Sequence, residues 1–234
     1  MNEPVPALVT MHVWHVPGRR IPHALLRMAA DRRALRRAAG LRFAKLLGTG
    51  DGRTFTVRDS DLTRWALLST WTGPTAADGF ERSAVARHWR RIAVERWRCD
   101  LVPLSSRGQW SRREPFGSPT TARWAGPVAA LTRARLVPSR AMTFWRAVPP
   151  VSADLRGRPG LRTAIGIGEA PIGVQGTFSV WDDAAALRDF AYDRPAHAAA
   201  IRQTAEKRWY GEELFARFGV LASTGSVFGT DPLA

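Results

Sequence analysis

The chain has 234 residues, 45% hydrophobic and 24% charged, with 35 Lys and Arg against 20 Asp and Glu and a formal net charge of +15. This composition is typical of a globular protein with a sizeable core, in one large or two small domains. No run of about eighteen apolar residues occurs, so no membrane-spanning helix is expected. The single cysteine, Cys99, excludes an internal disulfide.

The first half is predicted to contain four strands and two helical regions. Apolar residues that alternate or run together between glycines mark the strands, and the first helix opens at Pro22 with an apolar face and arginines outside it. In chain order we expect a strand over 9–16, a helix over 22–40, strands over 41–47 and 65–71, a helical region over 75–97 with a break near Ser83, and a strand over 99–104.

The second half follows the same plan after a linker over 108–127. Glycine and proline again separate short apolar runs. In chain order we expect a strand over 128–137, a helix over 139–148, strands over 161–168 and 176–181, helices over 184–190 and 194–218 with a break near Gly211, and a last strand beginning at Val220.

The repeat is visible in the residues as well as in the plan. LRFAKLLGTG at Leu41 resembles LRTAIGIGEA at Leu161, HWRRI resembles HAAAI, and LSSRG resembles LASTG, always in the same order. A duplication explains this better than chance, and each half reads βαββαβ, the ferredoxin-like unit. The predicted fold class is therefore α+β, with two such halves packed as an α+β barrel. The halves are expected at 1–107 and 128–234, with a ligand cavity between sheet and helices or between sheets.

Arginine supplies 33 of the 35 basic residues, because Lys45 and Lys207 are the only lysines. These arginines are spread along the chain, and neither zinc-ligand cysteine pairs nor an aromatic recognition strand is present, so no specific nucleic-acid partner is expected. A compositional bias that produces a solvated basic surface explains them. A role for some of them in holding the carboxylates of an anionic cofactor stays open.

Several segments resemble spheroidene monooxygenase and its relatives. They are GQWSRREPF at Gly108, VAALTRARL at Val128, IGIGEAP and QGTFSVW between Ile165 and Trp181, the block from His197 to Phe218, and GSVFGTDP at Gly225. The resemblance covers nearly the whole chain in one order and is densest after Gly108.

This resemblance implies a haem-containing, oxygen-dependent oxygenase of carotenoid biosynthesis, with the dimeric α+β barrel fold of aldoxime dehydratases and chlorite dismutases. It also implies a proximal histidine on a helix of the C-terminal half, a position that His197 matches. The expected cofactor is a b-type haem with iron, and the expected partners are O2, an apolar substrate such as a carotenoid, and an external ferredoxin or reductase. The chain itself has no flavin or nicotinamide motif.

The residues around His197 agree with an iron ligand. Asp193 can cap the predicted helix, Pro195 suits its first turn, and the positive end of a helix favours the neutral ring that a metal requires. Alanines at 196 and 198–200 would let a flat macrocycle approach, with Ile201 on the same face one turn on. A structural or exposed histidine is the alternative that the residues alone leave open.

Other residues are candidates for the pocket. Glu169 follows two glycines at a strand end, and either Gln175 or Ser179 could hydrogen-bond an iron-bound oxygen species from one face of a strand. Lys45 could hold a haem propionate, and Phe178 could line the pocket. The alternatives are a turn carboxylate for Glu169, a wet strand face for Gln175 and Ser179, a solvated Lys45 and a core Phe178.

Two other functions compete with the oxygenase reading. One keeps the haem but performs nitrogen–oxygen chemistry like aldoxime dehydration, and the other is a non-enzymatic haem-binding barrel or basic module. The opening residues, MNEPVPALVT, lack the basic region and apolar block of a secretory signal, so we expect a cytoplasmic protein. Peripheral association with a membrane surface and assembly into a homo-oligomer both stay open.

Overall fold

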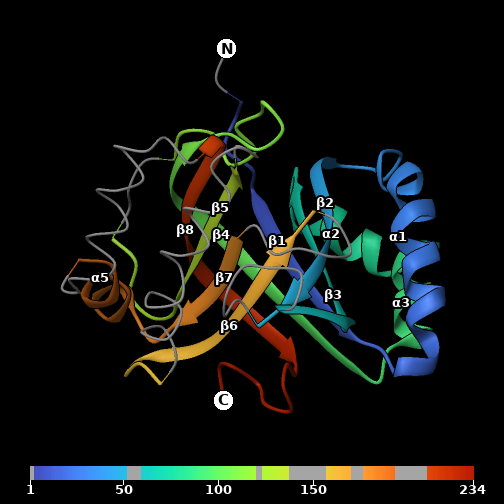
Figure 1. Cartoon of the computed structure of the whole chain (residues 1–234). Helices are drawn as coiled ribbons and strands as arrows, with labels where there is room; N and C mark the ends of the chain where they lie inside the picture. Colours follow the sequence, from blue (N-terminus) through green and yellow to red (C-terminus); the bar gives the residue numbers. More distant parts are fainter. Residues whose placement is uncertain (1–2, 52–58, 120–122, 137–156, 170–175, 193–209) are drawn as a thin grey trace.

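The computed structural model describes residues 3–51, 59–119, 123–136, 157–169, 176–192 and 210–234. Within them the chain forms a closed antiparallel β-barrel with helices on its outside (Figure 1). The first half contains β1 (Leu8–His15), the 3-10 turn η1 (Gly18–Arg20), α1 (Ile21–Leu35), β2 (Leu41–Gly50), β3 (Ser60–Trp71), α2 (Pro74–Glu81), α3 (Ala84–Ile92) and β4 (Glu95–Gly108). The second half contains β5 (Val128–Leu136), β6 (Leu161–Gly168), β7 (Gly176–Trp181), α5 (Ala184–Tyr192) and β8 (Tyr210–Gly225).

The strand order around the barrel is β1-β3-β2-β6-β7-β5-β8-β4. Each half contributes four adjacent strands in the same arrangement, since β2-β3-β1-β4 is repeated as β6-β7-β5-β8. The halves meet where β2 pairs with β6 over a few residues and where β4 pairs with β8 along most of its length. This confirms the predicted α+β barrel. The halves also hydrogen-bond edge to edge, which leaves no free strand edge in the barrel.

The two halves repeat each other in their irregularities. A β-bulge follows the first residue of β2 and again the first residue of β6. Each of these strands is preceded by a glycine in the left-handed region, Gly40 with φ 71° and Gly160 with φ 79°. A Cβ at these positions would lie 2.5 Å from the Cβ of Ala76 and 2.6 Å from that of Ala186. The turn and the closely packed helix therefore both require glycine.

The inward-facing side chains fill the barrel with one buried cluster. Residues 108–127, predicted as a linker, contribute to it, because Trp110 and Phe116 are fully buried there. The ring of Phe116 packs edge to face on Phe218, with 4.9 Å between centroids. Trp110 and Phe116 of this segment therefore belong to the core, and the barrel interior is packed with side chains.

The described helices lie mostly over the outer face of the first half. In the first half, α1, α2 and α3 lie over the sheet (Figure 1), and Trp14, Trp65 and Trp71 pack against Phe80 and Trp89 from the helices. In the described part of the second half, α5 lies against β5 and β7. None of the described helices has both the length and the hydrophobicity needed to cross a bilayer.

One prediction, which concerns residues near the end of the chain, is wrong. Residues 210–218, expected to continue a helix, belong to β8, which runs without interruption to Gly225. Leu214, Ala216 and Phe218 are buried at every second position and face the barrel interior, which is the period of a strand. Pairing with β4 and β5 on either side therefore decides the conformation of this segment.

Smaller differences concern where elements begin and end. The helical region expected over 75–97 is divided into α2 and α3, as the break near Ser83 predicted, but α3 ends at Ile92 and Trp97 lies in β4. The third strand begins at Ser60, earlier than expected. The helix predicted over 139–148 and the helical residues predicted over 194–209 lie outside the described residues.

Candidate functional site

Strand register identifies the equivalent positions of the two halves. Leu8 pairs with Trp71 in the first half and Val128 with Trp181 in the second, and both pairings continue without a shift. Trp71 therefore corresponds to Trp181. Side chains at alternate positions from these residues point outward, toward the helices, while the positions between them point into the barrel.

The outward positions of the first half hold large side chains. They are His12, Trp14, Leu46 and Leu67, all buried beneath the helices, with 5% of His12 and none of Leu67 exposed. The corresponding residues of the second half are Thr132, Ala134, Gly166 and Thr177. All four are smaller, and Thr132 is exposed while Thr177 is half-buried. We call the sheet surface of these four residues the small-residue face.

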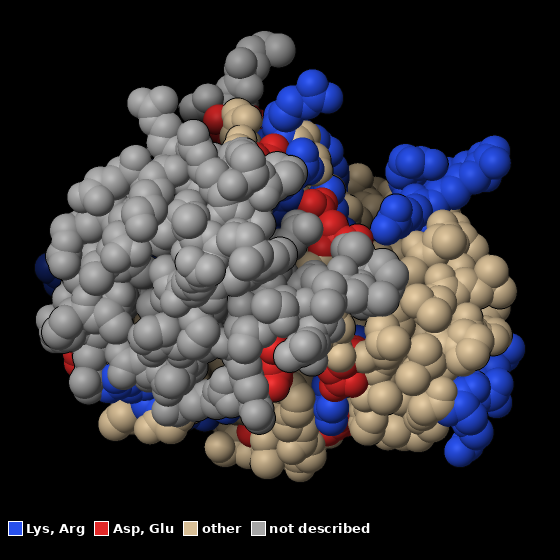
Figure 2. All heavy atoms as spheres, viewed as in Figure 1, with Lys and Arg blue, Asp and Glu red and all other residues tan. Residues whose placement is uncertain are grey.

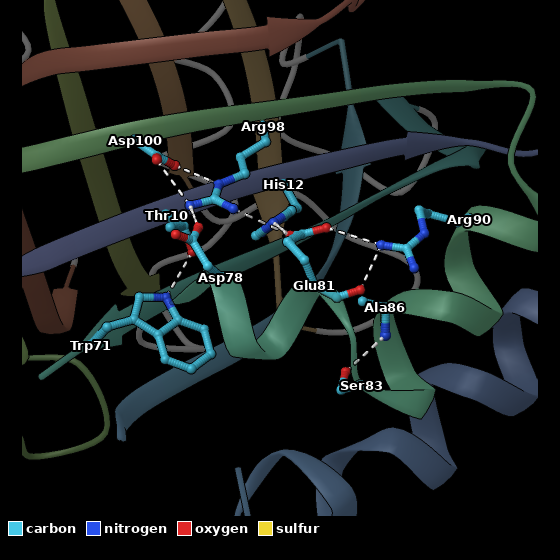
Figure 3. A network of polar contacts seen from close by, with 10 residues as sticks. All are labelled: Thr10, His12, Trp71, Asp78, Glu81, Ser83, Ala86, Arg90, Arg98 and Asp100. Carbon is cyan, nitrogen blue, oxygen red and sulfur yellow. Dashed lines mark hydrogen bonds and ion pairs between the residues drawn. The ribbon is translucent and has the colours of Figure 1, made fainter. Parts of the chain in front are cut away.

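A polar network completes the filled layer of the first half (Figure 3). Glu81 on α2 accepts a hydrogen bond from His12 Nε2 at 2.7 Å and lies 3.3 Å from Arg90 Nη1. Arg98 donates to Asp100 at 2.7 Å. Burial alone raises the pKa of Glu81, but the bond from His12 and the charges of Arg98 and Arg90 lower it below its ordinary value. The carboxylate stays charged and ties α2 to the sheet.

Ser179 lies beside the small-residue face. It points outward on β7, is 6% exposed, and its Oγ accepts a hydrogen bond from Trp181 Nε1 at 2.9 Å. Trp181 in turn stacks on Phe190 of α5, with 5.2 Å between ring centroids. A serine hydroxyl that accepts one hydrogen bond can also donate one, and the predicted bond from Ser179 to an iron-bound oxygen species stays a prediction.

Phe178 and Lys45 lie on the opposite side of the sheet from Ser179. Phe178 is fully buried inside the barrel, where its ring meets Trp97 edge to face at 6.1 Å. Lys45 shares the inward face of β2 with Phe43, and its Nζ lies 5.7 Å from the centre of that ring. Since the interior is packed, neither side chain reaches the small-residue face. Their predicted contacts with a cofactor stay predictions.

Glu169 belongs to an ion cluster that the sequence did not predict. Its Oε1 accepts from Lys45 Nζ at 2.5 Å and from Trp110 Nε1 at 2.9 Å, and its Oε2 accepts from Arg133 at 2.7 Å. Arg133, only 1% exposed, also pairs with Glu212. These five residues form what we call the barrel-end cluster. Arg133 occupies an inward position of β5, so no pattern of apolar alternation could have placed it there.

The charges of the barrel-end cluster limit its chemistry. Burial raises the pKa of Glu169, but the hydrogen bonds from Lys45 and Trp110 and the charge of Arg133 outweigh it and lower the pKa from 4.5 to about 2. Glu169 is therefore ionised at neutral pH and cannot donate a proton. A structural role in joining β2, β5 and residues 108–118 accounts for its contacts.

The remaining predicted site residues, Gln175, His197 and Ile201, lie outside the described residues. Among those that are described, no three His, Cys, Asp or Glu side chains gather as metal ligands. The small-residue face would nevertheless let a flat apolar group such as haem approach the sheet, because the buried Ala134 and Gly166 are smaller than Trp14 and Leu46. The sequence contains the small residues Gly166 and Thr177, but only the strand register shows that they take the places of Leu46 and Leu67.

The comparisons with known proteins point to one family. No protein-family model matches the chain. Spheroidene monooxygenase of Rhodobacter capsulatus is 38% identical over 217 residues, which cover 92% of this chain and 90% of that protein. The Rubrivivax gelatinosus protein of the same name is 42% identical over 80% of this chain and 71% of its own length. The Cereibacter sphaeroides one is 33% identical over 88% and 64%.

Solved structures agree on the fold. A crystal structure of aldoxime dehydratase superposes with a TM-score of 0.60, at 10% identity, over 91% of this chain and 80% of that one. The aldoxime dehydratase OxdRE in complex with butyraldoxime gives 0.62 at 9% identity, over 91% and 79%. These similarities concern the fold alone. The sequence identity, in contrast, extends over most of both chains, and the chain therefore belongs to the spheroidene monooxygenase family.

Proposed function

We propose that this protein is a haem-dependent monooxygenase that inserts oxygen from O2 into a carotenoid or another apolar metabolite. The observation that carries the proposal is the 38% identity with the Rhodobacter capsulatus enzyme across 92% of the chain. The small-residue face supports it, because its side chains are smaller than those at the equivalent positions of the first half, so a flat cofactor could lie against the sheet there.

We propose that His197 would hold a b-type haem through its iron, and that Ile201 and the small-residue face would contact the cofactor. Bound haem supplies the activation of O2, and the protein supplies the axial ligand, the shape of the pocket and hydrogen bonds. Ser179, beside this face, is the first proposed hydrogen-bond donor, because its hydroxyl can donate while its oxygen accepts from Trp181. Gln175, which precedes β7, is the second proposed donor.

The remaining partners follow from the same chemistry. Two electrons must come from outside for each oxygen atom inserted, so we propose an external ferredoxin or reductase as the donor. An apolar substrate partitions into lipid, so we also propose that the protein works at a membrane surface. A homo-oligomer is compatible with the closed barrel but is not needed to complete it.

The absorbance spectrum of the purified protein, with and without dithionite, tests the cofactor. We expect a Soret band that shifts on reduction and is lost or strongly displaced in His197→Ala. His23→Ala, which removes an exposed histidine of α1, is the matched control and should leave the spectrum unchanged. An unaltered Soret band in His197→Ala would contradict the ligand assignment.

Turnover tests the reaction. Conversion of a carotenoid should require both O2 and a reductant, and the inserted oxygen should derive from O2 when isotope-labelled gas is supplied. Conversion of an aldoxime in the absence of O2, without oxygenation of any polyene, would favour the dehydratase chemistry instead.

A further inference from the structure

Residues 18–40, on the outer side of the first half, form a basic surface with no exposed carboxylate of their own. Between Gly18 and Gly40 all the exposed charged residues are arginines, at positions 19, 20, 32, 33, 36 and 37. The acidic residue of this segment, Asp31, is 3% exposed and accepts a hydrogen bond from Trp89 Nε1 at 3.1 Å. We call the solvent-exposed side of residues 19–37 the α1 surface. Its charge is not neutralised locally, so it attracts polyanions.

The α1 surface is also apolar at its centre. Leu25 and Leu26 are 37% and 60% exposed and are followed by the exposed Ala29 and Ala30. One pair of arginines precedes this apolar stretch and two pairs follow it. Figure 2 shows the same arrangement along the edge that α1 forms in Figure 1, with Lys and Arg side chains gathered at its two ends and uncharged atoms between them.

Helical geometry places a leucine and an arginine on one side. Leu26 and Arg33 are separated by seven positions, so they share a stripe of α1, and Arg37 lies two residues beyond the end of the helix at Leu35. Long arginine side chains can extend away from such a stripe to reach polar groups while their stems cover apolar surface. This is the pattern of a helix that lies in the plane of a bilayer interface, with arginines at the headgroups and leucines below them.

The neighbouring helix extends the surface. α3 packs beside α1 and adds the exposed Arg87 and Arg91, and it contains no acidic residue. Val94, 66% exposed, follows it directly. α1 and α5 lie on opposite sides of the barrel (Figure 1). The exposed Leu25 and Leu26 favour a bilayer over an acidic redox protein, because a bilayer accepts apolar side chains beneath its charged headgroups.

We propose that the α1 surface docks the protein on an anionic lipid bilayer, with the arginines contacting lipid phosphates and Leu25 and Leu26 inserted beneath them. The proposed function explains why such docking is useful, since it brings the enzyme to the phase that dissolves its substrate. The docking itself requires neither haem nor turnover, so the two can fail independently.

Co-sedimentation with phosphatidylcholine vesicles, with and without phosphatidylglycerol, tests the charge requirement. The protein should bind the anionic vesicles, and more weakly as salt increases. Arg33→Gln with Arg37→Gln should weaken this binding by about tenfold or more, since each basic residue near an anionic surface contributes about 1 kcal/mol. The matched control, Arg107→Gln with Arg123→Gln, removes the same charge from exposed positions outside the helix layer and should bind almost as the unaltered protein does.

A second variant separates a bilayer from other polyanions. Leu25→Gln with Leu26→Gln keeps every charge and alters only exposed side chains, so the fold, checked by circular dichroism, should be retained. We expect it to lose vesicle binding but to bind duplex DNA or heparin as before. Equal losses in the Arg33/Arg37 variant and its control, or vesicle binding that is unchanged by the leucine substitutions, would overturn the proposal. The second result would identify a general polyanion surface, nucleic acid included.

Discussion

The two halves of the barrel share strand order, bulges and turn glycines, yet their outer faces differ. The first half buries Trp14, Leu46 and Leu67 beneath three helices, whereas the second has Ala134, Gly166 and Thr177 at the same positions. Loss of large side chains from a packed layer normally leaves a destabilising cavity. It is tolerated where another molecule occupies the space, because binding to the folded state stabilises that state.

This contrast assigns different tasks to the two copies of one unit. The first half stabilises the fold through a packed aromatic layer and the network around Glu81. The second half carries smaller side chains at the equivalent positions, where we propose that a ligand lies. In the spheroidene monooxygenase family, the contrast predicts that substitutions which make the second face resemble the first should impair function, while the reverse substitutions should impair stability.

The largest effect is expected from filling the small-residue face. Gly166→Leu with Thr177→Leu introduces the residues of Leu46 and Leu67 into the second half. Added side chains in the proposed pocket should lower haem affinity by about 5- to 150-fold, since overpacking costs about 1–3 kcal/mol. Titration of the apoprotein with haem, followed by the Soret band, measures this. Gly166→Ala with Thr177→Ser is the matched control, and equal affinities in both variants would show that the face does not contact the cofactor.

The reverse exchange should destabilise the protein without affecting the site. Leu67→Thr places the second half's residue in the filled layer, where Leu67 is fully buried among tryptophans. The lost packing and the buried hydroxyl should lower the free energy of unfolding by about 2–4 kcal/mol. Urea denaturation measures the loss, and the haem spectrum of the folded fraction should be unchanged. A variant as stable as the original would mean that the two faces are equally tolerant.

The smallest effect concerns acid stability. The pKa of Glu169 is lowered to about 2 in the fold, below its value in the unfolded chain. Its carboxylate therefore stabilises the fold above about pH 5, and this contribution disappears as the pH falls toward 2. Between these limits the original protein should lose about 2 kcal/mol more than Glu169→Gln, which lacks the titrating group. Denaturation curves at pH 5 and pH 3 measure the difference.

Glu213→Gln serves as the control for that comparison. Glu213 is a carboxylate of β8 next to Glu212 and pairs with the exposed Arg107 rather than with the barrel-end cluster. It should retain the pH dependence of the original protein. If Glu169→Gln does so too, the barrel-end cluster does not contribute to acid stability.

Local patterns were sufficient for most of the fold. Short apolar runs bounded by glycine predicted β6 and β7 over their full lengths, and the repeated LRFAKLLGTG and LRTAIGIGEA segments predicted the duplication. Residues 210–218 were assigned wrongly, because the sequence ELFARF satisfies a helical period as well as a strand period. Pairing with β4 and β5 resolves that ambiguity, and it involves residues far away in the chain.

The candidate site, too, was predicted from the sequence only in part. A resemblance carried by residues such as those from Ile165 to Trp181 was enough to indicate the family, which the relatives confirm. The sequence by itself determined the ferredoxin-like repeat and the family, because both are recognised from patterns of neighbouring residues along the chain. Only the tertiary structure decided that Ser179 and Phe178 face opposite sides of one sheet, that Glu169 is held by Lys45 and Arg133, and that the second half lacks the bulk of the first. These are properties of register and closure, which arise when strands distant in the chain pair.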